Sequence, residues 1–121
     1  MEGNEILNCI KILSDFPTIY NKGNQTPVDI MKESGYPRLF SLVTIENISK
    51  YLIQKPKLIK DWINYSYDIR HSPAWAFGQG KNGNWIVSYR GNGKLIEEHS
   101  YTDKFEACAK MIKMTFEEIR T

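Results

Sequence analysis

The chain has 121 residues, of which 41% are apolar and 25% are charged, and its formal net charge at neutral pH is +2. That length suits one domain with its own hydrophobic core, and the composition is that of a globular protein, not a disordered one. A net charge so near zero gives no electrostatic reason to expect a nucleic acid or a membrane as partner. We therefore expect residues 1–121 to form a single domain.

The N-terminal half has the apolar periodicity and the capping residues of helices. The segments with this pattern are residues 4–16, 26–35, 45–55 and 56–69. Pro17 is expected to end the first helix, and residues 17–25 are expected to form a polar link. Residues 36–43 form a short connector that the pattern does not assign.

The period changes after residue 73 from helical to strand-like. Residues 74–79, 85–90 and 94–100 are rich in β-formers or alternate in polarity, and Asn-Gly at 82–83 and Gly-Asn-Gly at 91–93 are tight-turn signals between them. Two short turns predict a three-stranded antiparallel meander, with the polar third strand at an edge. The second strand is apolar on both faces, so we expect the helical half to cover part of the second face.

A long helix is expected to follow the strands. Asp103 and Glu106 have the spacing of a capping box, and apolar residues then recur at helical spacing up to Ile119. This stripe predicts a helix that packs on the sheet. The expected fold is therefore α+β, with a helical N-terminal half, a three-stranded antiparallel meander and a long C-terminal helix packed on the sheet.

Cysteine usage and the N-terminus indicate a reducing compartment. Cys9 and Cys108 lie 99 positions apart among apolar residues, which favours buried free thiols over a disulfide framework. The first five residues lack the basic start and apolar run of a secretory signal, and no apolar stretch approaches the ~20 residues that span a bilayer. We expect a cytoplasmic protein without a membrane partner.

The sequence contains no recognisable catalytic or metal-binding motif. His71 and His99 have no His or Cys at ligand spacing. Glu97 and Glu98 are neighbours in an expected strand, so their side chains point to opposite faces and cannot form a paired-carboxylate site. We expect no enzyme activity, no cofactor, no metal and no small-molecule substrate; a small enzyme that uses His71 or His99 is the remaining catalytic alternative.

The order helix, strand, strand, strand, helix over about residues 57–120 resembles a double-stranded RNA-binding domain. In that family the last helix begins with a lysine cluster that contacts phosphates. The matching turn here, residues 103–106, reads Asp-Lys-Phe-Glu, and its two carboxylates would repel phosphate. Residues 79–83 also lack the family's Gly-Pro-x-His. A nucleic-acid-binding domain is kept as the alternative function.

Residues 68–120 resemble the small immunity proteins of bacterial polymorphic toxin and contact-dependent growth inhibition systems. The resemblance lies in the Trp-x-Phe strand at 72–77, the Asn-Gly-x-Trp strand at 82–87, the polar strand with Glu97-Glu98, and the Asp-x-x-Glu-Ala start of the closing helix at 103–109. It implies a protein that binds and neutralises one cognate toxin domain, often a nuclease, in the cytoplasm.

The resemblance also implies a protein partner and no direct contact with nucleic acid. Antidotes of nucleases are often strongly acidic, whereas this chain is not. Either the contact is local, or the toxin is not strongly basic, or this chain binds away from the active site of the toxin. Charge and strand position then give the candidate toxin-binding residues, which are Asp68, His71, Glu97, Glu98 and His99.

Overall fold

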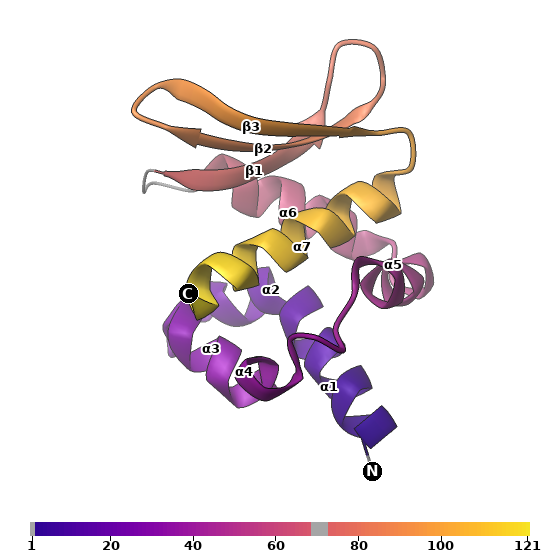
Figure 1. Cartoon of the computed structure of the whole chain (residues 1–121), viewed down its shortest axis with the longest axis vertical. Helices are drawn as coiled ribbons and strands as arrows, with labels where there is room; N and C mark the ends of the chain where they lie inside the picture. The colour runs from indigo at the N-terminus through magenta and orange to yellow at the C-terminus, as the bar shows by residue number, and fades with distance from the viewer. Residues whose placement is uncertain (1, 69–72) are drawn as a thin grey trace.

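The computed structural model describes residues 2–68 and 73–121. The elements in chain order are α1 (Glu2–Ser14), α2 (Phe16–Asn21), α3 (Pro27–Ser34), α4 (Tyr36–Leu39), α5 (Ile45–Gln54), α6 (Lys57–Asp68), β1 (Ala74–Gln79), β2 (Trp85–Gly91), β3 (Lys94–Tyr101) and α7 (Lys104–Arg120). The sheet lies at one end of the molecule, and α6 and α7 lie between it and the other helices (Figure 1). The expected α+β architecture is confirmed.

Two short helices occupy segments that the sequence pattern did not assign to helices. Pro17 does not end the first helix; it lies in the first turn of α2, after α1 has ended at Ser14. A first-turn proline costs no hydrogen bond, because its missing N–H would have no partner there. The predicted polar link is therefore wrong for residues 17–21, and the unassigned connector contains α4.

Thr26 and Thr44, the capping residues expected from the sequence before the second and third helical segments, form complete capping boxes in α3 and α5. The Thr26 hydroxyl accepts the Asp29 N–H at 3.1 Å, and the Thr44 hydroxyl accepts the Asn47 N–H at 3.1 Å. Gly35, at φ 85°, ends α3 in the left-handed conformation, which an L side chain rarely adopts. These signals fix both helices locally, before any packing.

The sheet is an antiparallel meander in the order β1-β2-β3, as the two turn signals predicted. Phe77 lies opposite Val87, which lies opposite His99. The register between β2 and β3 shifts at Tyr89/Arg90, so β3 contains an extra residue near its start. Such a bulge increases the local twist of the strand, and pairing resumes beyond it with Leu95 opposite Arg90.

One face of the sheet packs against α7, through residues that include Trp75, Phe77 and Val87. The expectation that the helical half covers the second face holds only for the end of α6, where Ser66 and Tyr67 border a shallow hollow of ≈ 240 Å³ on that face. The first five helices pack on the far side of α7, away from the sheet (Figure 1). Because α7 is buried from two sides, it supplies the apolar surface that both halves need.

The start of α7 differs from the expected capping box. Asp103 does cap the helix, since its Oδ1 accepts the Phe105 N–H at 2.8 Å. A capping box instead needs the cap side chain on the third helical N–H and the third side chain folded back on the cap. Because the Asp103 carboxylate is engaged one residue earlier, Glu106 is not part of the cap and borders a hollow beside α5.

Stability in the core depends partly on polar atoms at the ends of two N-terminal helices. Ser14 is fully buried, and its Oγ has no hydrogen-bond partner among the described residues. Ser34 is also buried, but its Oγ donates to the Met31 carbonyl oxygen at 2.6 Å and accepts the Tyr36 N–H at 3.1 Å. A buried polar atom without a partner costs free energy, whereas a satisfied one stabilises.

We therefore expect opposite effects from one substitution at two buried serines. Ser14→Ala should raise the free energy of unfolding by about 1 kcal/mol, because it removes an unpaired hydroxyl. Ser34→Ala should lower it by about 1–2 kcal/mol, because it leaves the Tyr36 N–H without its acceptor. Urea unfolding of the two variants measures both signs, and a loss of stability in Ser14→Ala would contradict the first.

Candidate functional site

The structure places three of the five candidate residues on β3 and a fourth elsewhere. Glu97, Glu98 and His99 lie in the middle of that strand, and Asp68 is the exposed last residue of α6. His71 lies outside the described residues. Most of the predicted site residues that the structure describes therefore lie on β3.

Glu97 and His99 share one face of the sheet, and Glu97 Oε2 contacts His99 Nε2. The imidazole also stacks on the Trp75 ring, with 6.3 Å between the centroids, and Trp75 contacts Tyr89 at 5.0 Å. Side chains two apart on a strand point the same way, so this pairing follows from the pleat. The result is a carboxylate and an imidazole in contact with each other and held against a buried aromatic surface.

Glu98 points to the other face of the sheet, where it lies opposite Ser88, whereas Glu97 lies opposite Tyr89. This is the separation that strand alternation predicted. β3 therefore presents one carboxylate on each of its faces. The two cannot cooperate as acid and base on one substrate, but both are available to a macromolecule that approaches the edge of the sheet.

A further carboxylate reaches the helix-facing side of the sheet from α7. The Tyr89 hydroxyl donates to the Glu118 carboxylate, and this bond, burial and the negative charge of Glu118 raise the pKa of Tyr89 above its usual range. Tyr89 also lies opposite Glu97. The aromatic surface under the start of β3 therefore lies between acidic groups of two elements.

The residues next to these charges include exposed apolar side chains that were not among the predicted site residues. Leu95 and Ile96 are 48% and 58% exposed, and Tyr67 at the end of α6 is 79% exposed. Two adjacent apolar residues in a strand that otherwise reads as polar are the signal that could have revealed this surface. The bulge beside them explains why neither is drawn into the core, since Leu95 pairs with Arg90 and Ile96 is the extra residue.

The two edges of the sheet differ in how they are covered. At the edge formed by β1, the Ser66 hydroxyl of α6 accepts the Phe77 N–H at 2.7 Å. β3 forms the other edge, and no hydrogen bond in the described part of the chain joins its outer side to another element. An uncovered edge strand is a template for pairing with another chain, and natural proteins usually protect such an edge.

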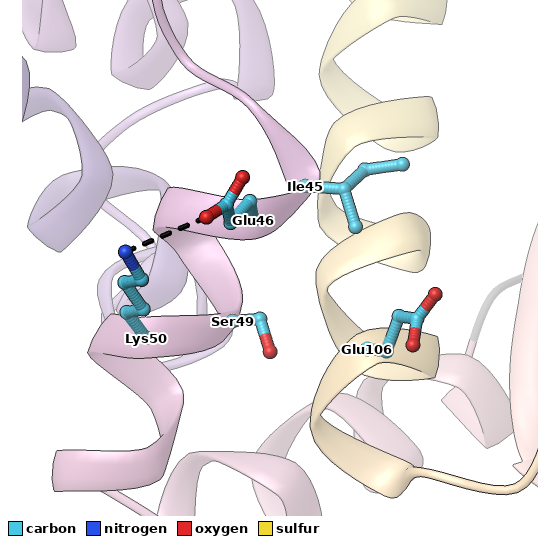
Figure 2. A pocket seen from close by; sticks show the side chains of 5 residues that line it. All are labelled: Ile45, Glu46, Ser49, Lys50 and Glu106. Atoms are coloured by element: carbon cyan, nitrogen blue, oxygen red, sulfur yellow. Dashed lines mark ion pairs between the residues drawn. The ribbon is translucent and has the colours of Figure 1, made fainter.

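A hollow of ≈ 300 Å³ lies between α5 and the start of α7. Figure 2 shows the side chains that line it. Its lining includes Ile45, Ser49 and Glu106, and Lys50 pairs with Glu46 at 3.5 Å. Both members of this pair are mostly exposed, so the ion pair is weak and solvated. The hollow offers neither an enclosed apolar wall nor a desolvated charge, which small-molecule sites generally have.

Neither cysteine has the surroundings of a reactive thiol. Cys9 and Cys108 are both free and buried, as their apolar neighbours predicted. Burial raises the pKa of each thiol, which keeps the sulfur protonated and a poor nucleophile. Within residues 2–68 and 73–121, no group of three or more His, Cys, Asp and Glu side chains could hold a metal ion.

Comparisons with protein-family models, with curated proteins and with solved structures find no match to this chain. None of the helices described here is long and apolar enough to cross a membrane. Any functional assignment therefore rests on the chemistry of the surface itself, and the surface around β3 combines exposed apolar side chains, acidic groups on both faces and an uncovered edge.

Proposed function

We propose that this chain is an immunity protein that binds a cognate bacterial toxin domain in the cytoplasm and neutralises it. The observation that supports this most is the surface at β3, where exposed Leu95 and Ile96 adjoin Glu97 and Glu98 on a strand with a free edge. An apolar centre flanked by charges is the usual composition of a tight protein–protein interface.

The small net charge of the chain, +2, is compatible with this role, because charge acts locally at an interface. A neutralising protein must dissociate slowly, and buried apolar anchors lower the dissociation rate. Glu97 and Glu98 would increase the association rate with a basic surface. The toxin need not be strongly basic overall, provided that it carries basic residues where it meets β3.

The first test is co-expression with the toxin-like C-terminal domain encoded directly upstream in the native locus. We expect a stable one-to-one complex, and we expect cells that express the toxin domain to survive only when this chain is present. A toxin domain that kills equally well with and without this chain, and that does not co-purify with it, would overturn the proposal.

We expect the double substitution Glu97→Gln and Glu98→Gln to lower the association rate with that toxin domain by about tenfold at low salt, because the attraction between charges mainly affects encounter. The difference from the wild type should shrink as salt rises. Glu46→Gln on α5 is the matched control, since it removes an exposed charge on another side of the molecule. Stopped-flow fluorescence measures the rates, and equal rates for the double variant and wild type would remove this patch from the interface.

The alternative is a nucleic-acid-binding domain of the double-stranded-RNA-binding type. The order α6, β1, β2, β3, α7, with both helices in contact with the sheet, favours it. The start of α7 argues against it, because Asp103 is the cap and Glu106 is exposed where phosphates would bind. Salt-sensitive binding of a 20-base-pair RNA duplex, lost on Lys104→Ala, would favour this alternative over the toxin partner.

A further inference from the structure

The hydrogen-bond pattern of the sheet shows which backbone groups of β3 face outward. In the first hairpin the Gly80 N–H donates to the Asn84 carbonyl oxygen at 2.7 Å, while the Phe77 N–H points away from β2 to Ser66. Antiparallel pairs alternate between bonded and non-bonded, so Phe77 and Val87 are a non-bonded pair. Val87 must then direct its N–H and C=O to β3, where it lies opposite His99.

It follows that His99 bonds inward to β2, and that its two neighbours bond outward. The N–H and C=O groups of Glu98 and Ser100 are therefore the donors and acceptors of the free edge. They are spaced as another strand requires, and both residues are exposed. The regular part of this edge runs from residue 97 to residue 101, because the bulge disturbs the pairing before it.

We propose that an extended segment of the partner protein adds to this edge as a fourth strand, hydrogen-bonded to the backbone of Glu98 and Ser100. The inference rests on the proposed toxin-binding function and names the contact through which it acts. Strand addition obtains affinity from main-chain hydrogen bonds and specificity from side chains that lie opposite one another. β3 offers both, whereas β1 does not, because α6 already covers its edge.

The charges on β3 indicate the chemistry of the added strand. Glu97 and Glu98 present a carboxylate on each face, and a residue directly opposite on the next strand lies within contact distance. An added strand with two successive Lys or Arg residues would place one basic group on each face. An apolar residue beyond them would cover Leu95 or Ile96, both of which are exposed.

The same charges disfavour a second copy of this chain as the occupant. Joining two β3 edges would bring both copies of Glu97 and Glu98 into one short ladder. That gives four carboxylates, with His99 of each copy already paired to Glu97 within its own strand. Like charges directly opposite on neighbouring strands are destabilising. A partner with a basic segment fits the edge better.

Ser100→Pro tests the edge without breaking the sheet. Proline lacks an N–H, but the Ser100 N–H faces outward and takes no part in the β2–β3 ladder, and proline is tolerated on edge strands in this position. We expect the melting temperature to change little and the affinity for the upstream-encoded toxin domain to fall by at least about thirtyfold. Ser100→Ala, which keeps the N–H, should bind within about threefold of the wild type.

Hydrogen exchange gives a second readout that does not depend on the proline variant folding. The amides of Glu98 and Ser100 should exchange quickly in the free protein and become protected in the complex, while the His99 amide is protected in both. Unchanged exchange of Glu98 and Ser100 in a complex that forms normally would overturn the strand addition and leave the proposed function standing.

A synthetic peptide tests the edge in the case where no toxin domain binds. It has ten residues, with alternating valine and threonine and a central Lys-Lys pair. If no toxin domain binds, protection of the Glu98 and Ser100 amides by millimolar peptide would still support the edge as a strand-binding site, and no protection would overturn it. A wild-type dimer that Ser100→Pro converts to monomer in sedimentation would overturn the basic partner and assign the edge to a second copy.

Discussion

Replacing Phe16 by alanine is expected to lower the free energy of unfolding by about 3–5 kcal/mol, the usual cost of emptying a buried aromatic site. Phe16 is fully buried and touches four other rings. The centroid distances are 5.5 Å to Tyr20, 5.8 Å to Trp62, 5.2 Å to Tyr65 and 5.2 Å to Phe116. These rings belong to α2, α6 and α7. The cavity would therefore remove packing contacts among the helices that join the two halves of the chain.

Two control substitutions show whether the loss of stability in Phe16→Ala comes from emptying a buried site. Phe16→Leu keeps an apolar side chain in the site and should cost no more than about half as much. Tyr67→Ala removes an aromatic ring that is 79% exposed and should change stability by less than about 0.5 kcal/mol. Thermal and urea unfolding measure all three. A loss for Phe16→Ala no larger than that for Tyr67→Ala would contradict the central role of the α2 ring.

The sheet could be predicted from the sequence because its signals are local. Asn-Gly at 82–83 specifies a tight turn, and both Gly83 and Gly93 adopt positive φ in the structure, at 80° and 74°. The β-rich segment 85–90 differs from β2 by one residue at its end. The caps of α3 and α5 were predictable for the same reason, since each is completed within four residues.

The parts that could not be predicted depend on tertiary packing. A proline is equally compatible with the end of one helix and the first turn of the next, so Pro17 alone does not distinguish the two. Burial of Phe16 and Pro17 in the core stabilises the helical conformation of α2. α4 has four residues, too few for any periodicity. The sequence also did not show which face of the sheet the N-terminal helices would cover. β2 is apolar on both faces, yet these helices pack behind α7 and leave the second face largely open.

The candidate site was predicted in part. Strand alternation placed Glu97 and Glu98 on opposite faces, and the structure confirms this. The pairing of His99 with Glu97 follows from the same period and could have been inferred. The adjacent apolar residues Leu95 and Ile96 are visible in the sequence, but the bulge that leaves both exposed is not, since Arg90 and its neighbours read as regular strand.

The end of α7 is attached to the N-terminal helices by a partly buried polar network. The Tyr36 hydroxyl donates to Glu117 Oε2 at 2.5 Å, and Arg120 donates to the same carboxylate from Nε at 3.0 Å and from Nη2 at 2.9 Å. The Arg120 guanidinium lies 3.8 Å from the centroid of the Phe40 ring, and Lys113 donates to the Phe40 carbonyl oxygen at 2.6 Å. Glu117 thus connects α7 to α4, and Lys113 and Arg120 connect α7 to Phe40, the residue that follows α4.

This network makes stability depend on pH in both directions. The hydrogen bond from Arg120 and that from Tyr36 lower the pKa of Glu117 from 4.5 to about 2. The carboxylate therefore contributes stability that is complete above pH 4.5 and is lost as the pH falls toward 2. Burial and the Glu117 charge raise the pKa of Tyr36 above 10, so ionisation of the unfolded state reduces stability again above pH 10.

We expect Glu117→Gln to lower the free energy of unfolding at pH 7 by about 2 kcal/mol, since the carboxylate is partly solvated and its pKa shift overstates the gain. The variant should also lose most of the acid-side decline between pH 4.5 and pH 2, because glutamine does not titrate. Tyr36→Phe should keep that acid dependence, although weakened, and should lose part of the decline above pH 10. Urea unfolding across this pH range measures these differences. If the free energy of unfolding of Glu117→Gln falls in acid as steeply as that of the wild type, another carboxylate is responsible for the acid dependence. The attachment of α7 would then depend on the packing around Phe16 and Phe116 alone.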